Sequence, residues 1–175
     1  MAITPDTKDW TWVLRRRCPE CGYDAAATTQ PAVPGLIRGN AAAWDAVLRR
    51  RDVTELRTRP QEDRWADVEY ACHVRDVFRT FDQRLVLMLG ADDPTFPNWD
   101  QDATAIADHY QEQDPVAVTG QLAEAADRIS GRFAGLTPAQ WERTGSRGDG
   151  AHFTVDSFAR YLIHDPVHHL HDVGG

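Results

Sequence analysis

One uninterrupted stretch of the chain, residues 65–89, constrains the fold more than any other. It contains no proline, and its apolar side chains recur at helical spacing. Gly90 follows and can take the left-handed conformation that ends many helices. A helix of this length without a proline favours a helix bundle. The predicted inner face consists of Ala71, Cys72, Phe78, Phe81, Leu85, Met88 and Leu89.

Three further segments are predicted to be long helices. The first covers residues 36–51, the second opens at Asp114-Pro115 with proline at the first helical position, and the third is capped by Thr154. Residues 101–111 are expected to form a shorter helix. Residues 52–64, 92–100 and 146–150 are predicted to be connections and loops, because turn residues are frequent in them.

These segments define the expected organisation of the chain. Its 175 residues, 42% of them hydrophobic and 26% charged, suit one domain with one core. Residues 1–34 are expected to form an irregular lead-in that contains a Cys-x-x-Cys turn, and residues 35–175 an all-α, four-helix bundle.

Histidines gather near the end of the chain, where four of the seven fall within residues 164–171. His164 and His168 are four residues apart, which places them on one face of a helix, at the spacing that two imidazoles need to share a metal ion. His169 and His171 point elsewhere, at steps of about 100° around the helix axis. Pro166 lies between the two candidate ligands and is expected to kink the helix. A solvated His-rich tail is the alternative interpretation.

His73 is the candidate third ligand, because it lies within the long apolar segment and can face the last helix. Three imidazoles that leave a coordination position open are typical of catalytic zinc, and they also suit nickel and iron. A packed core histidine is the alternative for His73. Asp76 and Asp165 are expected to orient the imidazoles as hydrogen-bond acceptors.

The lead-in carries Cys18-Pro19-Glu20-Cys21-Gly22, a tight turn of the kind that presents two thiolates to zinc. A complete structural site needs two further ligands, and the remaining cysteine, Cys72, has no neighbouring cysteine. Cys18 and Cys21 are therefore interpreted as half of a second metal site, as a redox pair, or as a tight loop.

Charge and composition restrict the partners. The net charge of −8 argues against nucleic acid or an anionic membrane. No apolar run is long enough to span a membrane, residues 1–5 do not resemble the start of a secretory signal, and three cysteines do not suit a disulfide framework. A cytoplasmic protein that acts on a small molecule is expected.

A histidine on the second long helix, combined with His-x-x-x-His on the last, resembles the DinB-like superfamily and the related mycothiol-dependent maleylpyruvate isomerase domain. The resemblance covers residues 33–173 and rests on Trp65, on residues 69–76 and on residues 164–169. It implies a four-helix bundle of the DinB-like type with one long crossover. The lead-in lies outside the common domain, and the isomerases place a carboxylate where His164 stands.

The same resemblance implies a divalent metal, zinc first and nickel or iron as alternatives, held by His73, His164 and His168. It further implies a homodimer and a low-molecular-weight thiol such as mycothiol as cofactor. The expected function is thus a metal-dependent S-transferase or isomerase. A hydrolase that uses metal-bound water, or a non-catalytic metal- or ligand-binding stress-related module, is the alternative, and no catalytic residue is identified beyond the ligands.

Four side chains are candidates for binding the substrate. Arg160 lies one turn before His164, and Arg84 lies eleven residues after His73, which returns it to within about 20° of the same direction on the helix. Either arginine could bind a carboxylate, or form a surface salt bridge instead. Trp99 and Asp100 are expected at the mouth of the cleft, with a core tryptophan beside a helix-capping aspartate as the alternative.

Overall fold

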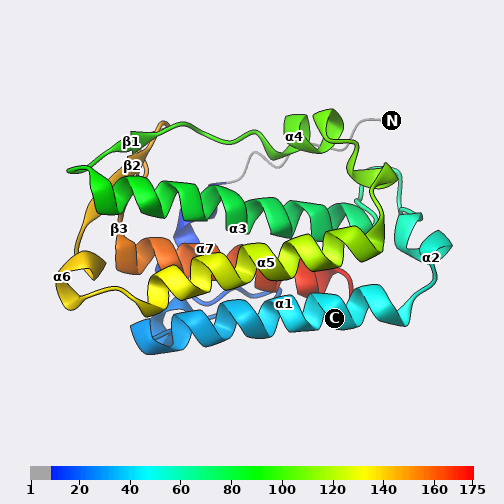
Figure 1. Ribbon diagram of the computed structural model, residues 1–175, viewed down its shortest axis with the longest axis horizontal. Coiled ribbons are helices and arrows are strands. Elements are labelled where there is room, and N and C mark those ends of the chain that lie inside the picture. The colour runs from blue at the N-terminus through cyan, green and yellow to red at the C-terminus, as the bar shows by residue number, and fades with distance from the viewer. Residues whose placement is uncertain (1–8) are drawn as a thin grey trace.

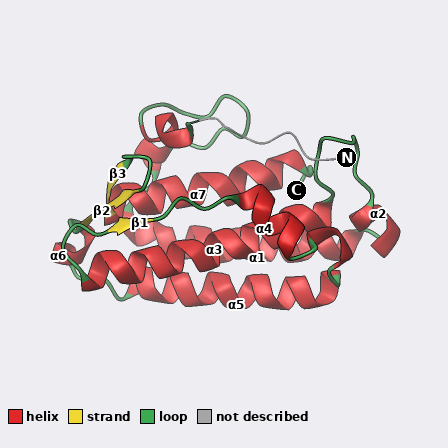
Figure 2. Cartoon of the chain, turned by 90° about the horizontal axis from the view of Figure 1, so that it is seen from above, coloured by secondary structure: helices red, strands yellow, loops and turns green. Residues whose placement is uncertain are grey.

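The computed structural model describes residues 9–175. Four long helices form the predicted all-α bundle, α1 (Val33–Arg50), α3 (Asp67–Gly90), α5 (Pro115–Ala134) and α7 (Val155–Asp172). Helices α1 and α3 each pack against both α5 and α7 (Figures 1 and 2). Helices α1 and α3 therefore lie diagonally opposite each other in the bundle. The predictions for residues 1–8, including the expected absence of a secretory signal, lie outside the described residues.

Shorter helices connect and cover the bundle. They are α2 (Val53–Arg57), α4 (Gln101–Ala107), α6 (Pro138–Trp141) and the 3₁₀ helices η1 (Trp10–Leu14), η2 (Ala25–Ala27), η3 (Gln30–Ala32) and η4 (Tyr110–Glu112). The prediction of a plain connection over residues 52–64 was wrong for α2. Asp52 caps that helix by accepting from the backbone of Thr54 and Glu55, while the Glu55 side chain accepts from the Asp52 backbone.

A small sheet closes one end of the bundle, and no strand was predicted there, although two of its strands overlap the predicted loops at residues 92–100 and 146–150. Its strands, in spatial order, are β1 (Thr95–Phe96), β2 (Thr144–Arg147) and β3 (His152–Thr154), with β1 parallel and β3 antiparallel to β2. Phe96 and Phe153 point from this sheet onto Phe158 of α7, each with ring centroids 5.9 Å apart. Burial of these rings outweighs the turn-forming tendency of the local sequence.

The helix ends follow the predicted caps except at one place. Asp114 accepts from the backbone of Val116 with Pro115 at the first position, and Thr154 forms a capping box with Ser157. Gly90 was predicted to end its helix in the left-handed conformation, but it is the last helical residue and the extended Ala91 follows it. Helix α7 continues through Pro166, and the kink expected there stays a prediction.

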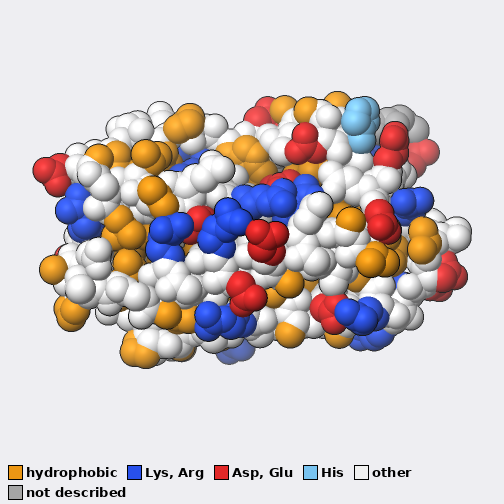
Figure 3. All heavy atoms as spheres, in the orientation of Figure 1, with side chains coloured by type: hydrophobic (Ala, Val, Ile, Leu, Met, Phe, Trp, Pro, Cys, Tyr) orange, Lys and Arg blue, Asp and Glu red, His pale blue; other side chains and the backbone are white. Residues whose placement is uncertain are grey.

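The core lies between the four long helices and is closed by aromatic side chains. The rings of Phe81 on α3 and Phe158 on α7 stack with centroids 4.7 Å apart, and Trp44 of α1 is completely buried. On the face shown in Figure 3, Lys and Arg side chains lie among Asp and Glu side chains. Within residues 9–175, no helix is long and apolar enough to cross a membrane.

Candidate metal centres

Three side chains of types that can bind a metal converge where α3 faces α7. His73 comes from α3 and is fully buried, while Asp165 and His169 lie one turn apart on α7. Nε2 of His73 lies 3.1 Å from Oδ1 of Asp165, and Nε2 of His169 lies 3.7 Å from the same oxygen. One ligand atom from each residue lies within 4.8 Å of the other two. These three residues are called the pocket site.

The imidazoles of the pocket site are held in place by their neighbours. Nδ1 of His169 donates a hydrogen bond to Asp172, 3.0 Å away, which leaves Nε2 facing the centre of the site. Trp99 stacks on His73 with ring planes only 3° apart and centroids 5.4 Å apart. Asp76 was expected to orient an imidazole, but its carboxylate binds Arg75 and the hydroxyl of Tyr110 instead.

The spacing and donor chemistry of the pocket site fit a divalent ion. Two imidazole nitrogens and a carboxylate oxygen are ligands that zinc, nickel and iron accept. An ion about 2.0–2.2 Å from each ligand places neighbouring ligand atoms about 3–3.5 Å apart, close to the two distances measured from Asp165. A set of three protein ligands leaves coordination positions for a small molecule.

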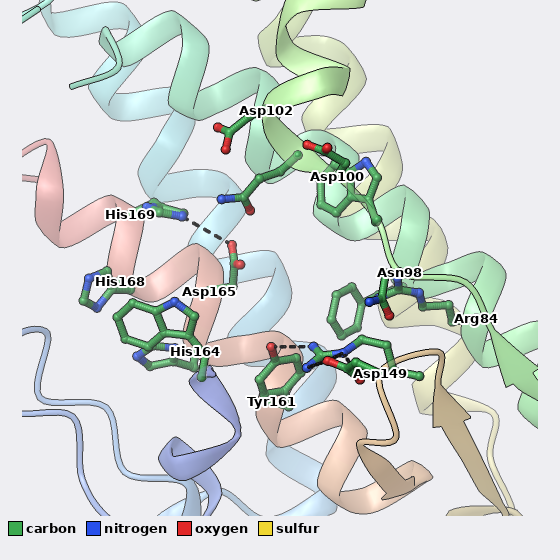
Figure 4. A pocket seen from close by; sticks show the side chains of 15 residues that line it. Arg84, Asn98, Asp100, Asp102, Asp149, Tyr161, His164, Asp165, His168 and His169 are labelled. Atoms are coloured by element: carbon green, nitrogen blue, oxygen red, sulfur yellow. Dashed lines mark hydrogen bonds and ion pairs between the residues drawn. The ribbon is translucent and has the colours of Figure 1, made fainter. Parts of the chain in front are cut away.

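Asp165 and His169 of the pocket site line a cavity of about 400 Å³ (Figure 4). His164 and His168 lie on the same side of this cavity, and Arg84 and Asp149 lie on the opposite side. The cavity is lined by residues of the lead-in, of α3 and α7, of the segment that leads into α4, and of β2 and its turn. It therefore joins the potential metal ligands to a space in which a small molecule fits.

Arg84 and Arg147 give the far side of the cavity positive charge. Arg147 binds Asp149 at 2.8 Å and the hydroxyl of Tyr161 at 3.0 Å. Arg84 is buried, donates to the backbone oxygen of Pro97, and has no carboxylate within salt-bridge distance among residues 9–175. Burial and the charge of Arg147 lower the pKa of Arg84 to about 10, so it remains cationic at neutral pH.

A second group of potential ligands lies on the neighbouring face of α7. His164 and His168 meet Cys18 and Cys21 of the lead-in, and one ligand atom from each residue lies within 4.8 Å of the other three. Sγ of Cys18 is 3.7 Å from Nδ1 of His168. These four residues are called the Cys–His site.

Burial sets the direction of the pKa shifts in the Cys–His site, whereas His73 sets it for Asp165 of the pocket site. It lowers the pKa of His164 to about 4, with the charge of His168 as the next cause, and it also lowers the pKa of His168. Both imidazoles are therefore neutral at pH 7, which is the form that binds metals. Burial acts to raise the pKa of the Asp165 carboxyl, but the charge and hydrogen bond of His73 outweigh it and lower this pKa to about 2.

The structure divides the predicted three-histidine set between the two sites. Among residues 9–175, no group of three mutually close ligand atoms contains His73 together with His164 or His168. Asp165 accepts a hydrogen bond from Nε2 of His73 at 3.1 Å, as expected of a group that orients an imidazole. His169, which was expected to point elsewhere, is the third member of this group. The signal for them was available, because Asp165 and His169 are themselves four residues apart.

The four predicted substrate-binding residues have different outcomes. Arg84, Trp99 and Asp100 all line the cavity. Asp100 also caps α4 by accepting from the backbone of Ala103, as the alternative interpretation proposed. Arg160 lies outside the cavity lining, where it binds Asp156 and the backbone oxygen of Ala25, and thus forms the salt bridge considered for it.

Comparisons with known proteins agree with the fold. A family model described as the DinB superfamily matches residues 36–173. A solved structure of YfiT from Bacillus subtilis, described as a probable metal-dependent hydrolase with an unusual four-helix bundle topology, is similar with a TM-score of 0.74 and 17% sequence identity. The match covers 83% of this chain and 85% of that one, and at this identity it shows the fold alone. None of the curated proteins matches the chain.

Proposed function

Because this chain belongs to the DinB superfamily, we propose that it is a metal-dependent enzyme whose divalent ion is held by His73, Asp165 and His169. The proposed reaction is the transfer of a low-molecular-weight thiol, of the mycothiol type, to a small anionic substrate, or the isomerisation of such a substrate with the thiol as cofactor. Zinc is the proposed ion, with nickel or iron as alternatives.

The observation that carries this proposal is the direction in which the pocket site opens. Its three ligand atoms converge from α3 and α7, and two of the three ligands line a cavity of about 400 Å³. A purely structural ion is normally enclosed by four protein ligands. A set of three ligands beside a cavity of this size is the arrangement that a catalytic ion requires.

The chemistry divides between the ion and the side chains around it. A divalent ion bound here would supply Lewis acidity and lower the pKa of a thiol or water that coordinates it. Asp172 keeps Nε2 of His169 directed at the site by accepting the proton on Nδ1. Trp99 covers the ring of His73 and restricts the access of water to it.

Arg84 supports an anionic substrate. Its guanidinium is a buried cation in the cavity wall that binds only the backbone oxygen of Pro97 among hydrogen-bonding groups of residues 9–175. A carboxylate on the substrate could bind it with two parallel hydrogen bonds. Arg147 reinforces the positive field nearby, although Asp149 already neutralises part of its charge.

The order of the two ligands on α7 supports the thiol-dependent reaction. The isomerases that the sequence resembles place a carboxylate at the first ligand position of the last helix. Asp165 followed four residues later by His169 has this order, which the pair His164 and His168 lacks. The proposed ligand order therefore agrees with that of the isomerases, while the lead-in and Pro166 still distinguish this chain from them.

A hydrolase is the second candidate function. It is favoured by the similarity to YfiT, which is described as a probable metal-dependent hydrolase. The same open positions could take up a water molecule in place of a thiol, and the same cationic wall could bind an anionic substrate. The two candidates differ in whether a thiol enters the coordination shell.

The test is a titration of the cobalt-substituted protein with mycothiol, followed by its visible spectrum. Wild type and His73→Ala are titrated in parallel, because both keep the cysteines of the lead-in, so that thiolate absorption gained by the wild type alone comes from thiol bound at the pocket site. An increase of the thiolate-to-cobalt band that occurs in the wild type and is absent in His73→Ala supports the transferase or isomerase. An unchanged spectrum, together with hydrolysis of carboxylate-bearing esters or amides, would favour the hydrolase. No bound cobalt would overturn both.

A further inference from the structure

The Cys-x-x-Cys turn of the lead-in is built to present two thiols on one side. The backbone N–H of Gly22 donates to the oxygen of Cys18 at 3.0 Å, and the N–H of Cys18 donates to the oxygen of Tyr23 at 2.8 Å. Gly22 has a φ of 77°, which a residue with a side chain rarely adopts. Nε of Arg17 donates to the oxygen of Gly22 and holds the turn closed.

Helix α7 supplies two imidazoles to the same place. His164 and His168 lie one turn apart with ring centroids 5.1 Å from each other. Both are at least nine-tenths buried, with 3% and 7% of their surface exposed. Nε2 of His164 is buried and has no hydrogen-bond partner among the described residues. A buried polar atom without a partner costs free energy, which a bound ion would offset.

We propose that Cys18, Cys21, His164 and His168 bind a structural zinc ion, separate from the ion of the pocket site. Two thiolates and two imidazoles form one of the usual ligand sets of structural zinc. Zinc–sulfur bonds of about 2.3 Å and zinc–nitrogen bonds of about 2.0–2.1 Å place tetrahedral ligand atoms about 3.3–3.8 Å apart. The 3.7 Å between Sγ of Cys18 and Nδ1 of His168 fits that range.

This ion would fasten the lead-in to the helix that carries the pocket site. Outside the Cys–His site, the contacts of the lead-in with α7 include the Tyr23 hydroxyl on the backbone oxygen of Arg160 and the packing of Trp10 on His164 and His168. Trp10 also lines the cavity. The zinc ion thus fixes a wall of the cavity, and it does so with all four ligands from the protein, so that it has no position for a substrate.

Glu20, within the turn, is placed to support this site. Its carboxylate lies 3.4 Å from Nε2 of His168, on the side of the ring opposite the nitrogen that faces Cys18. A carboxylate at that position fixes the orientation of a metal-binding imidazole. The same turn therefore supplies both two ligands and one orienting group.

The test measures zinc and cobalt in the full chain and in two sets of variants. The wild-type protein is expected to bind one zinc ion at each site. Cys18→Ser/Cys21→Ser should lose one of them, together with the thiolate-to-cobalt band of the cobalt form. His73→Ala should lose the other ion and keep that band. Cys72→Ala is the matched control, because Cys72 is buried against Tyr110 and should change neither ion.

Other outcomes would overturn the proposal. These are zinc content that does not change in the double cysteine variant, a cobalt form without a thiolate band, or a disulfide between Cys18 and Cys21 in the protein purified without reductant. The disulfide would assign the pair to redox chemistry. The proposed function is tested independently, because it predicts that His73→Ala loses metal whether or not Cys18 and Cys21 bind an ion.

A measurement on the wild-type protein covers the case in which the cysteine variant does not fold. Titration with an organomercurial should release one zinc ion for every two thiols of the Cys–His site that react. Limited proteolysis after removal of zinc should then cleave the lead-in well before the bundle. Zinc release that does not follow modification of the thiols would contradict the site.

Discussion

Nε2 of His73 lies 3.1 Å from Oδ1 of Asp165, across the contact between α3 and α7. This distance decides which residues of the histidine-rich helix belong to the candidate catalytic site. Asp165 and His169 face α3, whereas His164 and His168 face the lead-in. Two pairs of residues, each with a spacing of four, therefore serve two different places on neighbouring faces of one helix.

Replacement of His73 by alanine should weaken binding of the pocket ion by about 100-fold or more, since loss of a ligand exceeds the 10- to 100-fold effect of an orienting group. His109→Ala is the control, because His109 is exposed and lies outside both sites. Zinc affinity is measured by competition with a chelator. Equal affinities in the two variants would remove His73 from the ligand set.

Replacement of Asp172 by asparagine should weaken the binding of the ion at the pocket site by about 10- to 100-fold, because the hydrogen bond that fixes His169 loses its charge. The exposed Asp127→Asn, on α5, is the matched control. The same competition assay applies. A loss confined to the thiolate-bound ion would show instead that Asp172 acts on the Cys–His site.

Replacement of Arg84 by glutamine should weaken binding of a carboxylate substrate or inhibitor by about 10- to 100-fold, the usual effect of a charged hydrogen bond. Metal content should not change, because Arg84 is not among the ligands. Arg128→Gln, an exposed arginine on α5, controls for the lost positive charge. An effect on affinity that both variants share would indicate long-range electrostatics rather than a contact.

The carboxylate of Asp76 should stabilise the fold at neutral pH and lose that effect in acid. It accepts from Arg75 at 2.6 Å and from Tyr110 at 2.7 Å. Burial acts to raise its pKa, but these hydrogen bonds and the charges of Arg75 and Arg79 lower it below the ordinary 3.8. The stabilisation is therefore complete above the ordinary value and disappears as pH falls through the lowered one.

Asp76→Asn should accordingly lower the free energy of unfolding by about 3 kcal/mol at neutral pH, since it breaks a buried charged pair. The difference from wild type should shrink as the pH falls below the ordinary carboxyl pKa of 3.8 and through the lowered pKa of Asp76. Urea unfolding at several pH values measures it, with Asp127→Asn, an exposed aspartate that also pairs with an arginine, as control. A difference that does not depend on pH would mean that packing, not charge, explains the loss.

Replacement of Gly145 by alanine should destabilise the protein by about 1–3 kcal/mol through overpacking. A Cβ at this position in β2 would lie 2.8 Å from Cγ of Met88, which is fully buried, and 3.3 Å from the backbone oxygen of Pro94. Gly120→Ala is the control, because it lies in α5 with open space around it and should stabilise the helix by up to about 1 kcal/mol. Thermal unfolding of both variants measures the effect. A melting temperature of Gly145→Ala that is not lowered would show that the surrounding side chains accommodate the added methyl group.

Much of the fold followed from local pattern. The four long helices, the cap at Thr154 and the proline at the start of α5 all appear as predicted. The sheet did not, because strands of two to four residues have too little periodicity to separate them from turns. They form because Phe96 and Phe153 gain burial against α7, and no local sequence signal contains that contact.

The sequence showed which residues are candidate metal ligands more readily than it showed which of them belong to the same site. Sequence spacing pointed to the histidines of α7 and to the two cysteines of the lead-in as metal ligands, and the position of His73 within a long apolar helix pointed to His73. It could not tell which face of α7 meets α3, because adjacent residues on a helix differ by about 100° and both pairs repeat after four. The rotation of α7 depends on the packing of its whole apolar face, including Phe158 on Phe81.

The helices, their caps and the kinds of chemistry that the chain can support are predictable from local sequence, since they depend on neighbours within one or two helical turns. The grouping of the candidate ligands, in contrast, depends on tertiary packing. Cys18 meets His168 over 150 residues of chain, and His73 meets Asp165 over 92. Such contacts follow from how the helices and the lead-in pack together, which is a property of the complete core and not of any segment of the chain.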